Sequence, residues 1–468
     1  MRITKIEIKN FRAFPRTYQI NLHKAGKNLL VYGENGSGKS SVYLALKLFL
    51  ESSDDNTIRF ETDRNIFIKD DGHIKVHLRA TPESNKCIYE WSRTVKETTD
   101  PLIINASKSK GFFDYKALLE THYLHQESDT VDVFDLLIAT LLANVINNVT
   151  DRSIFDDWKN ILELRPSRRN ATQQVATLSG ELEVFNRGLT QRLAELQTLA
   201  SEILRKFGYN VALNFDFEGI SYNRDDNTLD NQQILLTVQF FDQELPKHHR
   251  FLNEAKLSAI ALSIYFAGVL LQPDSDLKIL ALDDVLIGLD MSNRLPVLDI
   301  LEEYFSDYQI FLTTYDKAWY EIVKQRTAEN QWKYAEFYFA ETDEYELPVY
   351  VDDKTYLEQA QEYLSANDYK ACAIYLRTAF ETILKEYCAD KRLPVRYRRN
   401  PASLNSQDFW DAIKNHTSVL EPSLINDIEL YRNIILNPLS HETIANIYRR
   451  EIEEAMEAVE QLKDELNP

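Results

Sequence analysis

A glycine-rich loop at residues 33–41, GENGSGKSS, has the residue types and spacing that bind phosphate. It follows the apolar segment NLLVY (28–32) and precedes VYLALKLFL (42–50), which predicts a strand, a loop and a helix in that order. Glycines let successive backbone N–H groups turn toward phosphate oxygens, and the N-terminus of the following helix favours an anion. The residues expected to bind a nucleotide here are Gly33, Glu34, Asn35, Gly36, Ser37, Gly38, Lys39, Ser40 and Ser41.

The loop matches the P-loop pattern G-x-x-x-x-G-K-[S/T], which predicts ATP as the ligand and Mg2+ as the cofactor. Lys39 is expected to reach the β and γ phosphates, and the Ser40 hydroxyl is expected to bind magnesium. A glycine-rich turn that merely precedes a helix is the structural alternative.

Two adjacent carboxylates, Asp283 and Asp284, supply the other part of a hydrolytic site. They lie in the string KILALDDV (278–285), whose apolar run predicts a buried strand. ATP hydrolysis needs one carboxylate that holds magnesium through water and a second that polarises the attacking water. We expect Asp283 to do the first and Asp284 the second; an acidic turn after a buried strand is the structural alternative.

The composition is that of an ordered protein that repels nucleic acid at long range. Of the 468 residues 44% are hydrophobic and 27% are charged, and 53 basic against 73 acidic side chains give a formal charge of −20. Nucleic-acid binding stays an open question, because it would need a local basic patch. KRLPVRYRR (391–399) and RPSRR (165–169) are the candidates, and each is otherwise a solvated loop.

Three cysteines are too few for a disulfide framework. The charged N-terminus lacks the apolar core of a signal peptide, and the most apolar stretch, 257–271, is shorter than a membrane span. We therefore expect a cytoplasmic protein with no membrane partner.

The periodicity of the chain predicts four segments. Residues 1–150 have α/β character, and 151–207 predict a short helical hairpin whose longer arm of roughly 38 residues would reach about 57 Å. Residues 208–347 return to strands and helices and complete the α/β domain. The acidic connector ETDEYELPVYVDDK (341–354) leads into an all-helical segment, 348–468.

Over roughly residues 1–345 the chain resembles the ABC/SMC/RecF superfamily of ATPases. The opening ITKIEIKNFRAF (3–14), with a P loop within forty residues of the start, is similar to the RecF-type N-terminus. The resemblance implies an α/β fold, that of an ABC/SMC-type P-loop NTPase head. It makes Gln126, in YLHQ (123–126), a Q-loop sensor of magnesium and γ-phosphate.

The segment FLNEAKLSAIALSIYFA (251–267) stands where this superfamily has its signature motif, without the usual serine and glycines. The resemblance implies that Asn253 and Lys256 donate to the γ-phosphate bound by a partner in a head-to-head dimer. A capped buried helix is the alternative. GLD (288–290) resembles the D-loop, so Asp290 would face that partner.

Two catalytic positions depart from the superfamily. Asp284 stands where glutamate is usual, and Tyr315, in TTYD (313–316), stands where a switch histidine is usual. Aspartate is one methylene shorter, and a phenol bonds phosphate but does not carry charge near neutral pH as imidazole does. We therefore expect slow hydrolysis. The expected catalytic set is Asp284, Asp283, Lys39 and Tyr315, and the expected metal set is Ser40, Gln126 and Asp283.

The C-terminal helical segment resembles HEPN-like domains, with Arg377 and Glu381 on an early helix and Arg432 and His441 later. Catalytic members of that family have four to six residues between the arginine and the histidine, whereas eight separate them here. An RNase site, a partner-binding or assembly module, and a structural cap are the three interpretations.

Three functions follow from these resemblances. The layout is most similar to bacterial anti-phage ATPases, the AriA type of PARIS systems with the PtuA type of Septu as a relative. It implies a homo-oligomeric scaffold that senses a phage-encoded trigger, a DNA-mimic protein, and releases a separate nuclease effector of the TOPRIM class. A RecF-like DNA-repair ATPase and an ATP-gated HEPN ribonuclease are the alternatives.

Overall fold

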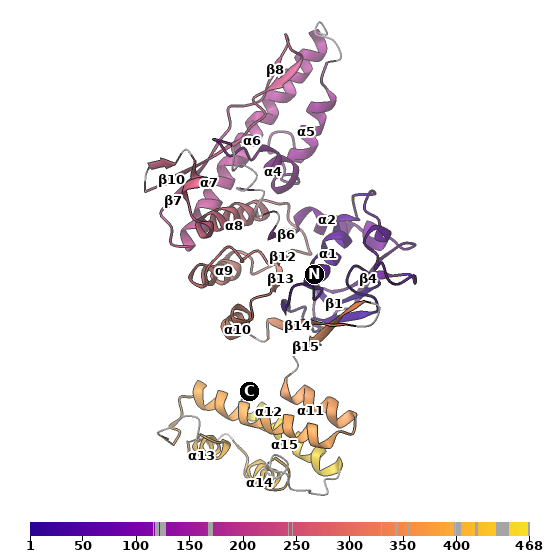
Figure 1. The fold of residues 1–468 in the computed structure, drawn as a ribbon, viewed down its shortest axis with the longest axis vertical. Coiled ribbons are helices and arrows are strands. Elements are labelled where there is room, and N and C mark those ends of the chain that lie inside the picture. Colours follow the sequence, from indigo (N-terminus) through magenta and orange to yellow (C-terminus); the bar gives the residue numbers. More distant parts are fainter. Residues whose placement is uncertain are drawn as a thin grey trace. The chain divides into compact units, whose positions relative to one another are not determined.

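The structure is a computed structural model of the whole chain (Figure 1). It describes residues 1–115, 117, 121, 128–166, 172–241, 243–245, 247–328, 330–341, 345–352, 355–396, 398, 404–416, 420–436 and 449–466. The chain divides into two compact units, Met1–Asp352 and Asp353–Pro468.

A six-stranded sheet forms the centre of the first unit. Its strands are, in spatial order, β15 (Glu346–Asp352), β14 (Trp332–Glu341), β3 (Asn28–Gly33), β13 (Gln309–Thr314), β12 (Ile279–Asp283) and β6 (Gly111–Asp114). The five strands from β14 to β6 are parallel, and β15 is antiparallel to β14. The carboxyl ends of the parallel strands therefore gather at one edge, where α/β sheets bind their ligands.

Helices cover both faces of this sheet, so its strands are apolar on both sides. Leu29 and Val31 of β3 belong to one core and Leu30 to the other. The first core contains α1 (Lys39–Glu51), and the second contains α8 (Glu254–Leu270), α9 (Met291–Tyr304) and α10 (Lys317–Arg326). The sheet is thus held on both faces by apolar packing, which fixes the loops at its edge.

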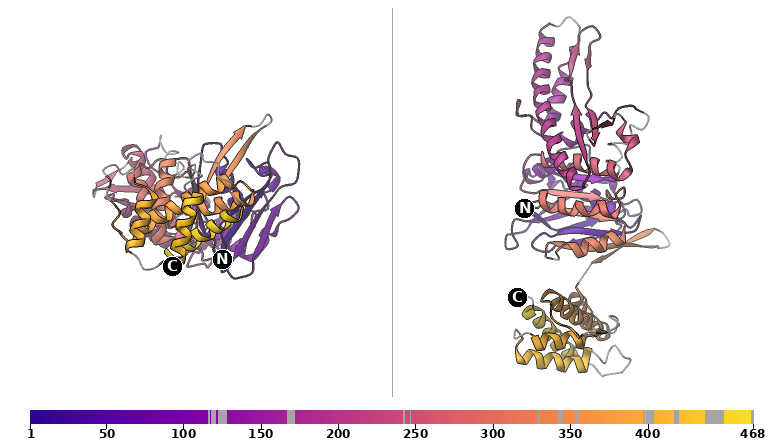
Figure 2. Two further views of the ribbon diagram at one scale, coloured as in Figure 1. Left: turned by 90° about the horizontal axis from the view of Figure 1, so that it is seen from below. Right: turned by 90° about the vertical axis from the view of Figure 1, so that its left-hand side faces the viewer.

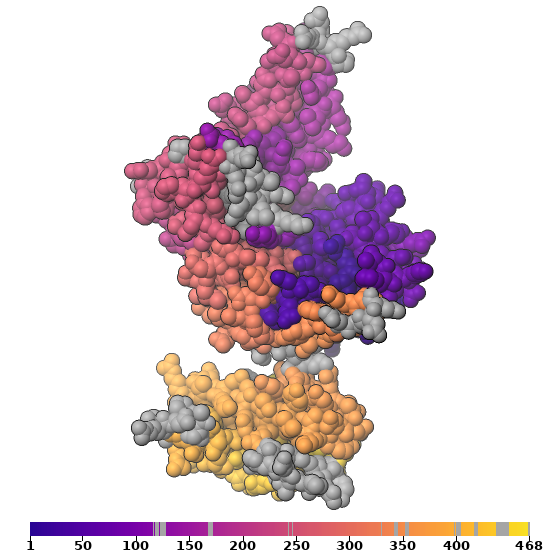
Figure 3. Space-filling view, viewed as in Figure 1, coloured from indigo at the N-terminus to yellow at the C-terminus, as the bar shows by residue number. Residues whose placement is uncertain are grey.

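A four-stranded antiparallel sheet packs into the same core as α1. Its order is β2 (Tyr18–Asn21), β1 (Arg2–Lys9), β4 (His73–Arg79) and β5 (Cys87–Ser92), and η1 (Phe60–Asp63), η2 (Glu97–Thr99) and α2 (Pro101–Ser109) complete this lobe. Figure 3 shows the indigo N-terminal segment against the orange β14–β15 segment, where Tyr18 Oη donates to Pro348 O at 2.6 Å.

The predicted helical hairpin contains α5 (Ile154–Glu163) and a second helix of 35 residues, α6 (Thr172–Lys206). The apolar side of α6, including Leu182, Leu189 and Leu196, is buried in the core that also contains α8. Figures 1 and 2 show α6 rising from the sheet with α5 beside it and a two-stranded ribbon, β8–β9, along it. The ribbon was not predicted.

Shorter elements connect the α5–α6 hairpin to the six-stranded sheet. They are α4 (Phe134–Leu136), η4 (Leu137–Leu141), β7 (Val211–Asp216), β8 (Ser221–Asn223), β9 (Thr228–Asp230), β10 (Leu235–Phe240), β11 (Gln243–Leu245) and α7 (His248–Phe251). Strands β11, β10 and β7 form a separate antiparallel sheet.

The second unit is helical in all its described elements and has its own apolar core. These elements are α11 (Tyr356–Ser365), α12 (Tyr369–Asp390), α13 (Ser406–His416), α14 (Pro422–Tyr431), the π-helical turn η6 (Arg432–Leu436) and α15 (Arg449–Leu466). Within the described ranges of either unit, no helix is long and apolar enough to cross a membrane.

Candidate functional site

The glycine loop joins β3 to α1 at the edge of the sheet where the parallel strands end. Gly36 and Gly38 have φ values of 89° and 100°, a region that residues with a Cβ rarely adopt. A Cβ on Gly33 would lie 2.4 Å from Ser37 Oγ and 2.9 Å from Phe337 O, so only glycine fits. The loop therefore has the tight backbone turn that lets N–H groups surround an anion.

Ser37 and Lys39 are two of the three buried polar side chains of the loop. Ser37 Oγ has no hydrogen-bond partner among the described residues, so its hydroxyl can donate to an anion. Lys39 is 4% exposed. Its Nζ donates to Glu34 O at 3.2 Å and lies 3.5 Å from Asp284 Oδ2.

The two serines after Lys39 differ in their environment. Ser40 is exposed, so its hydroxyl is accessible to a ligand. Ser41 is buried, and its Oγ accepts a 3.4 Å hydrogen bond from Ala13 N. Ser41 therefore supports the loop from behind, while the Glu34 and Asn35 side chains are exposed at its tip.

Near their carboxyl ends, β12 and β13 pair Asp283 with Thr313. Thr313 Oγ1 donates to Asp283 Oδ1 at 2.6 Å and accepts from Asp284 N at 3.2 Å, so one hydroxyl holds both aspartates. No cluster of three or more His, Cys, Asp or Glu in the described parts could hold a metal alone. Magnesium is usually bound by one or two carboxylates together with substrate phosphates, and Asp283 with the Ser40 hydroxyl fits that set.

Asp284 has a φ of 53°, in the left-handed region that aspartate and asparagine tolerate best after glycine. Its Oδ1 accepts a 3.0 Å hydrogen bond from Tyr315 N, and its Oδ2 faces Lys39. Burial raises the pKa of the Asp284 carboxyl; Lys39 opposes this rise and Asp283 adds to it. A carboxylate in this position can accept a proton from water.

The signature-like segment begins α8. Asn253 is the N-cap, and its Oδ1 accepts from Lys256 N at 3.0 Å, so the oxygen is engaged in the cap and the side chain's donor is its NH2 group. Lys256 Nζ lies 5.3 Å from the Tyr209 ring centroid and 5.7 Å from that of Phe240. The ammonium group of Lys256 is therefore held near these two rings.

The D-loop-like segment precedes α9. Asp290 is the N-cap, and its Oδ1 accepts from Asn293 N at 3.0 Å and from Ser292 Oγ at 2.8 Å. A Cβ on Gly288 would lie 2.4 Å from Ser258 Oγ of α8. The D-loop-like segment and the signature-like segment are therefore packed against each other.

The structure brings one group of the predicted residues together and leaves the rest apart from it. Lys39, both aspartates and the backbone of Tyr315 meet at the sheet edge, and the Tyr315 ring is 40% exposed. No hydrogen bond or ion pair found in the described ranges joins the glycine loop to Asn253, Lys256 or Asp290. Gln126 and His441 lie outside the described residues.

Two further polar residues lie at this edge and were not predicted as site residues. Thr313 binds both aspartates, and Asp114 is the register neighbour of Asp283 across β6 and β12. Each stands at or next to the end of a short apolar run, FFD in one case and QIFLTT in the other, as Asp283 does. That shared signal could have found them.

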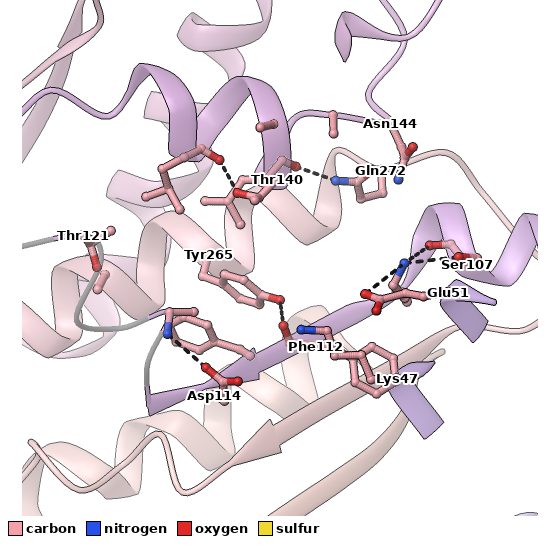
Figure 4. Close-up of a pocket in the computed structure, with 18 residues that line it drawn as sticks. Lys47, Glu51, Ser107, Phe112, Asp114, Thr121, Thr140, Asn144, Tyr265 and Gln272 are labelled. Atoms are coloured by element: carbon pink, nitrogen blue, oxygen red, sulfur yellow. Dashed lines mark hydrogen bonds and ion pairs between the residues drawn. The ribbon is translucent and has the colours of Figure 1, made fainter. Parts of the chain in front are cut away.

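A separate pocket of about 500 Å3 lies between α1, α2, β6, η4 and α8 (Figure 4). Its polar groups include Lys110, whose Nζ donates to Ser107 O at 2.8 Å and lies 3.8 Å from Glu51, and Tyr265, which donates to Phe112 O. No residue of the glycine loop lines this pocket, so it is not the phosphate site.

In the second unit the predicted polar residues are held in internal contacts. Arg377 Nε donates to Glu381 at 3.0 Å. Arg432 is 7% exposed, donates to Gln407 Oε1 at 2.8 Å and lies over the Phe380 ring. These contacts favour a structural role for both arginines.

The basic segment 391–399 is partly neutralised. Arg398 forms a two-pronged ion pair with Asp408, at 2.8 and 2.9 Å, and this holds the pKa of Asp408 below its usual value. Arg165, of the second basic segment, donates to Asn227 O at 3.0 Å.

Comparison with known families gives one match over most of the chain. The model described as "RecF/RecN/SMC N terminal domain" matches residues 2–331. No curated protein matches.

Solved structures of SMC heads are similar to this chain. A SmcHead bound to the C-winged helix domain of ScpA has 15% identity and a TM-score of 0.42, covering 76% of this chain and 100% of that chain. A Pyrococcus furiosus Smc head domain with an extended coiled coil, bound to the C-terminal domain of ScpA, has 14% identity and a TM-score of 0.44, covering 78% of this chain and 99% of that chain. The SMC head domain from Thermotoga maritima has 14% identity and a TM-score of 0.35, covering 75% of this chain and 100% of that chain.

Proposed function

Since the chain belongs to the RecF/RecN/SMC N-terminal domain family and so contains an ABC/SMC-type ATPase head, we propose that it binds ATP with Mg2+ on the glycine loop and hydrolyses it slowly. The observation that carries this proposal is the meeting of Lys39, Asp283 and Asp284 at one sheet edge, with Thr313 holding both aspartates. These are the groups that ATP hydrolysis requires.

Each residue has a role that its environment supports. Lys39 and the loop N–H groups bind the β and γ phosphates, and the buried Ser37 hydroxyl adds a donor. Ser40 and Asp283 hold magnesium, which neutralises phosphate charge when bound. Gln126, by family resemblance, senses the same ion.

Asp284 is the proposed base: it orients the attacking water and takes its proton. Hydrolysis is slow because the aspartate side chain is short and because Tyr315 replaces a group that could carry charge near neutral pH. A turnover well above about ten per second, the middle of the enzyme range, would contradict this.

A second copy of the chain completes the site in this proposal. Asn253, Lys256 and Asp290 would reach the nucleotide of the partner, because none of them is bonded to the glycine loop of its own chain. Two apolar side chains near these segments are exposed, Phe251 by 68% and Ile287 by 37%, and a dimer interface would bury them.

The finer proposal is a scaffold of an anti-phage complex. The ATPase head would comprise 1–150 and 208–352 with the hairpin 151–207 inserted, because β15 belongs to the sheet of the first unit and not to the helical segment predicted from 348. The helical unit Asp353–Pro468 would bind partners or assemble copies. The burial of Arg432 favours assembly over RNA cleavage, because a nuclease would need this arginine accessible to its substrate. The head would hold a nuclease effector and release it on sensing a phage protein, as the AriA resemblance implies.

The test is purification of the full chain together with the product of the neighbouring gene. We expect a stable complex in ATP, and its dissociation when a phage-encoded DNA-mimic protein is added. Lys39→Ala serves as the matched control, because it removes ATP binding in every interpretation. A chain that binds ATP but never retains the neighbouring protein would contradict the scaffold while leaving the ATPase intact.

A further inference from the structure

Arg294 is the one buried arginine among the described residues of the first unit, and the nucleotide chemistry does not explain its burial. It lies in the first turn of α9 and is 9% exposed. Burial of a charged group is unfavourable, and a positive charge near a helix N-terminus is unfavourable as well. Such an arginine is stable only if its donors are all placed against strong acceptors.

The donors of Arg294 join two separate loops. Its Nε donates to Leu286 O at 3.0 Å and to Leu289 O at 2.7 Å, which are carbonyls of the turn between β12 and α9. Its Nη1 donates to Asp316 Oδ2 at 2.6 Å. One planar group therefore connects the D-loop-like segment to the segment that carries Tyr315.

Asp316 divides its two oxygens between two tasks. Oδ1 caps α10 by accepting from Trp319 N at 3.1 Å, and Oδ2 binds Arg294. Burial alone would raise the pKa of Asp316. The hydrogen bonds from Arg294 and from Trp319 N together outweigh this effect, so the pKa is lowered from its usual value. The carboxylate is therefore held in place from both sides.

The connection reaches the proposed base through one peptide group. Tyr315, directly before Asp316, donates its backbone N–H to Asp284 Oδ1 at 3.0 Å. At the other end, the turn that Arg294 holds contains Gly288, which packs against Ser258 of α8. Hydrogen bonds thus form a continuous path from the turn through Arg294 and Asp316 to the Tyr315 peptide and Asp284.

We propose that Arg294 is a positioning residue that couples the D-loop-like segment to the Tyr315 segment, so that contact with a second copy sets the position of Asp284. This rests on the proposed ATPase function and names the regulation of that same site. Arg294 does not touch the nucleotide; it acts through Asp316 and the Tyr315 peptide.

The test uses the full chain with Arg294→Met, Asp316→Asn and the double variant. Asparagine keeps an N-cap oxygen for α10 but presents no charge to Arg294, so Asp316→Asn breaks the coupling with little effect on the helix. Arg326→Met is the matched control, since Arg326 also pairs with an aspartate, Asp299 at 3.3 Å, on an exposed surface.

Each variant is measured for kcat, KM, the affinity for a fluorescent ATP analogue, and the thermal midpoint. We expect kcat to fall by roughly 10- to 100-fold in both single variants, because a small displacement of a catalytic group has effects of that order. Affinity should stay within about threefold of wild type, since the glycine loop is unchanged. The kcat of the double variant should be no lower than that of the less active single variant, because both substitutions break the same connection. Arg294→Lys should recover part of kcat.

The contrary results are distinct from these. Unchanged kcat in Asp316→Asn, or multiplied effects in the double variant, would overturn the coupling, and Asp316→Asn decides this even if Arg294→Met fails to fold. A loss of affinity in step with kcat would show a general structural role and also overturn it. A wild-type chain that neither binds nor hydrolyses ATP would overturn the proposed function itself.

Discussion

At the scale of single residues, the structure gives a physical reason for an aspartate at position 284. The backbone there has a φ of 53°, and the short polar side chains of Asp and Asn are the ones that tolerate this conformation. A glutamate would have the longer reach that the superfamily uses, but it would strain the turn. The backbone conformation therefore favours the shorter aspartate, the residue to which we attribute the proposed slow hydrolysis.

Replacing the proposed base is the first prediction. Asp284→Asn keeps the φ preference and the acceptor for Tyr315 N but loses the proton-accepting oxygen. We expect phosphate release to fall by roughly 10²- to 10⁴-fold, the usual contribution of a general base. ATP affinity, measured by titration calorimetry, should change little. Equal loss of binding and hydrolysis would contradict the assignment.

The second prediction concerns pH. Asp284 acts in its ionised form, and its raised pKa means that protonation begins at a higher pH than for an exposed aspartate, about 3.9. Hydrolysis should therefore decrease as the pH is lowered, with a midpoint above that value. A pH–rate profile of kcat measures this, and the acid limb should be absent from the residual activity of Asp284→Asn.

At the scale of elements, the glycine loop and its flanking strand and helix could be predicted from the sequence, because the pattern is local. The structure has β3 at Asn28–Gly33 and α1 at Lys39–Glu51, as the apolar runs on either side of the loop indicated. What could not be predicted is long-range: Thr313 meets Asp283 only because β13 and β12 are neighbours in the sheet. The β8–β9 ribbon escaped notice because its strands are three residues each, too short for a periodic pattern.

Helix α6 offers a matched pair of glycines for the third prediction. A Cβ on Gly180 meets nothing within 4 Å, whereas a Cβ on Gly188 would lie 1.8 Å from Asn147 Oδ1. Gly180→Ala should stabilise the unit by about 0.5–1 kcal/mol through helix propensity. Gly188→Ala should destabilise it by about 1–3 kcal/mol through overpacking. Thermal unfolding measures both, and equal shifts would show that α6 is not docked as described.

At the scale of the whole molecule, the chain consists of two units with separate cores. No buried residue of the core in the second unit belongs to either core of the first. Each unit should therefore fold without the other. Arg432, which donates to Gln407, packs against Phe380 within the second unit's own core.

Truncation after Asp352 is the fourth prediction. We expect residues 1–352 to remain folded and to bind ATP with an affinity within about threefold of the full chain, because the nucleotide residues and both cores lie in this unit. Titration with a fluorescent ATP analogue checks this. An aggregated fragment, or one without ATP affinity, would show that the helical unit is part of the head.

The central claim is that ATP is bound on the glycine loop and closed over by a second copy of the chain. Its most direct test is the mass in solution of Asp284→Asn with ATP and Mg2+, compared with Lys39→Ala under the same conditions. The account predicts a dimer or higher multiple for Asp284→Asn that disappears on removal of ATP, and no ATP-dependent change for Lys39→Ala. An Asp284→Asn chain that binds ATP but stays monomeric, or a Lys39→Ala chain that dimerises equally with ATP, would contradict it.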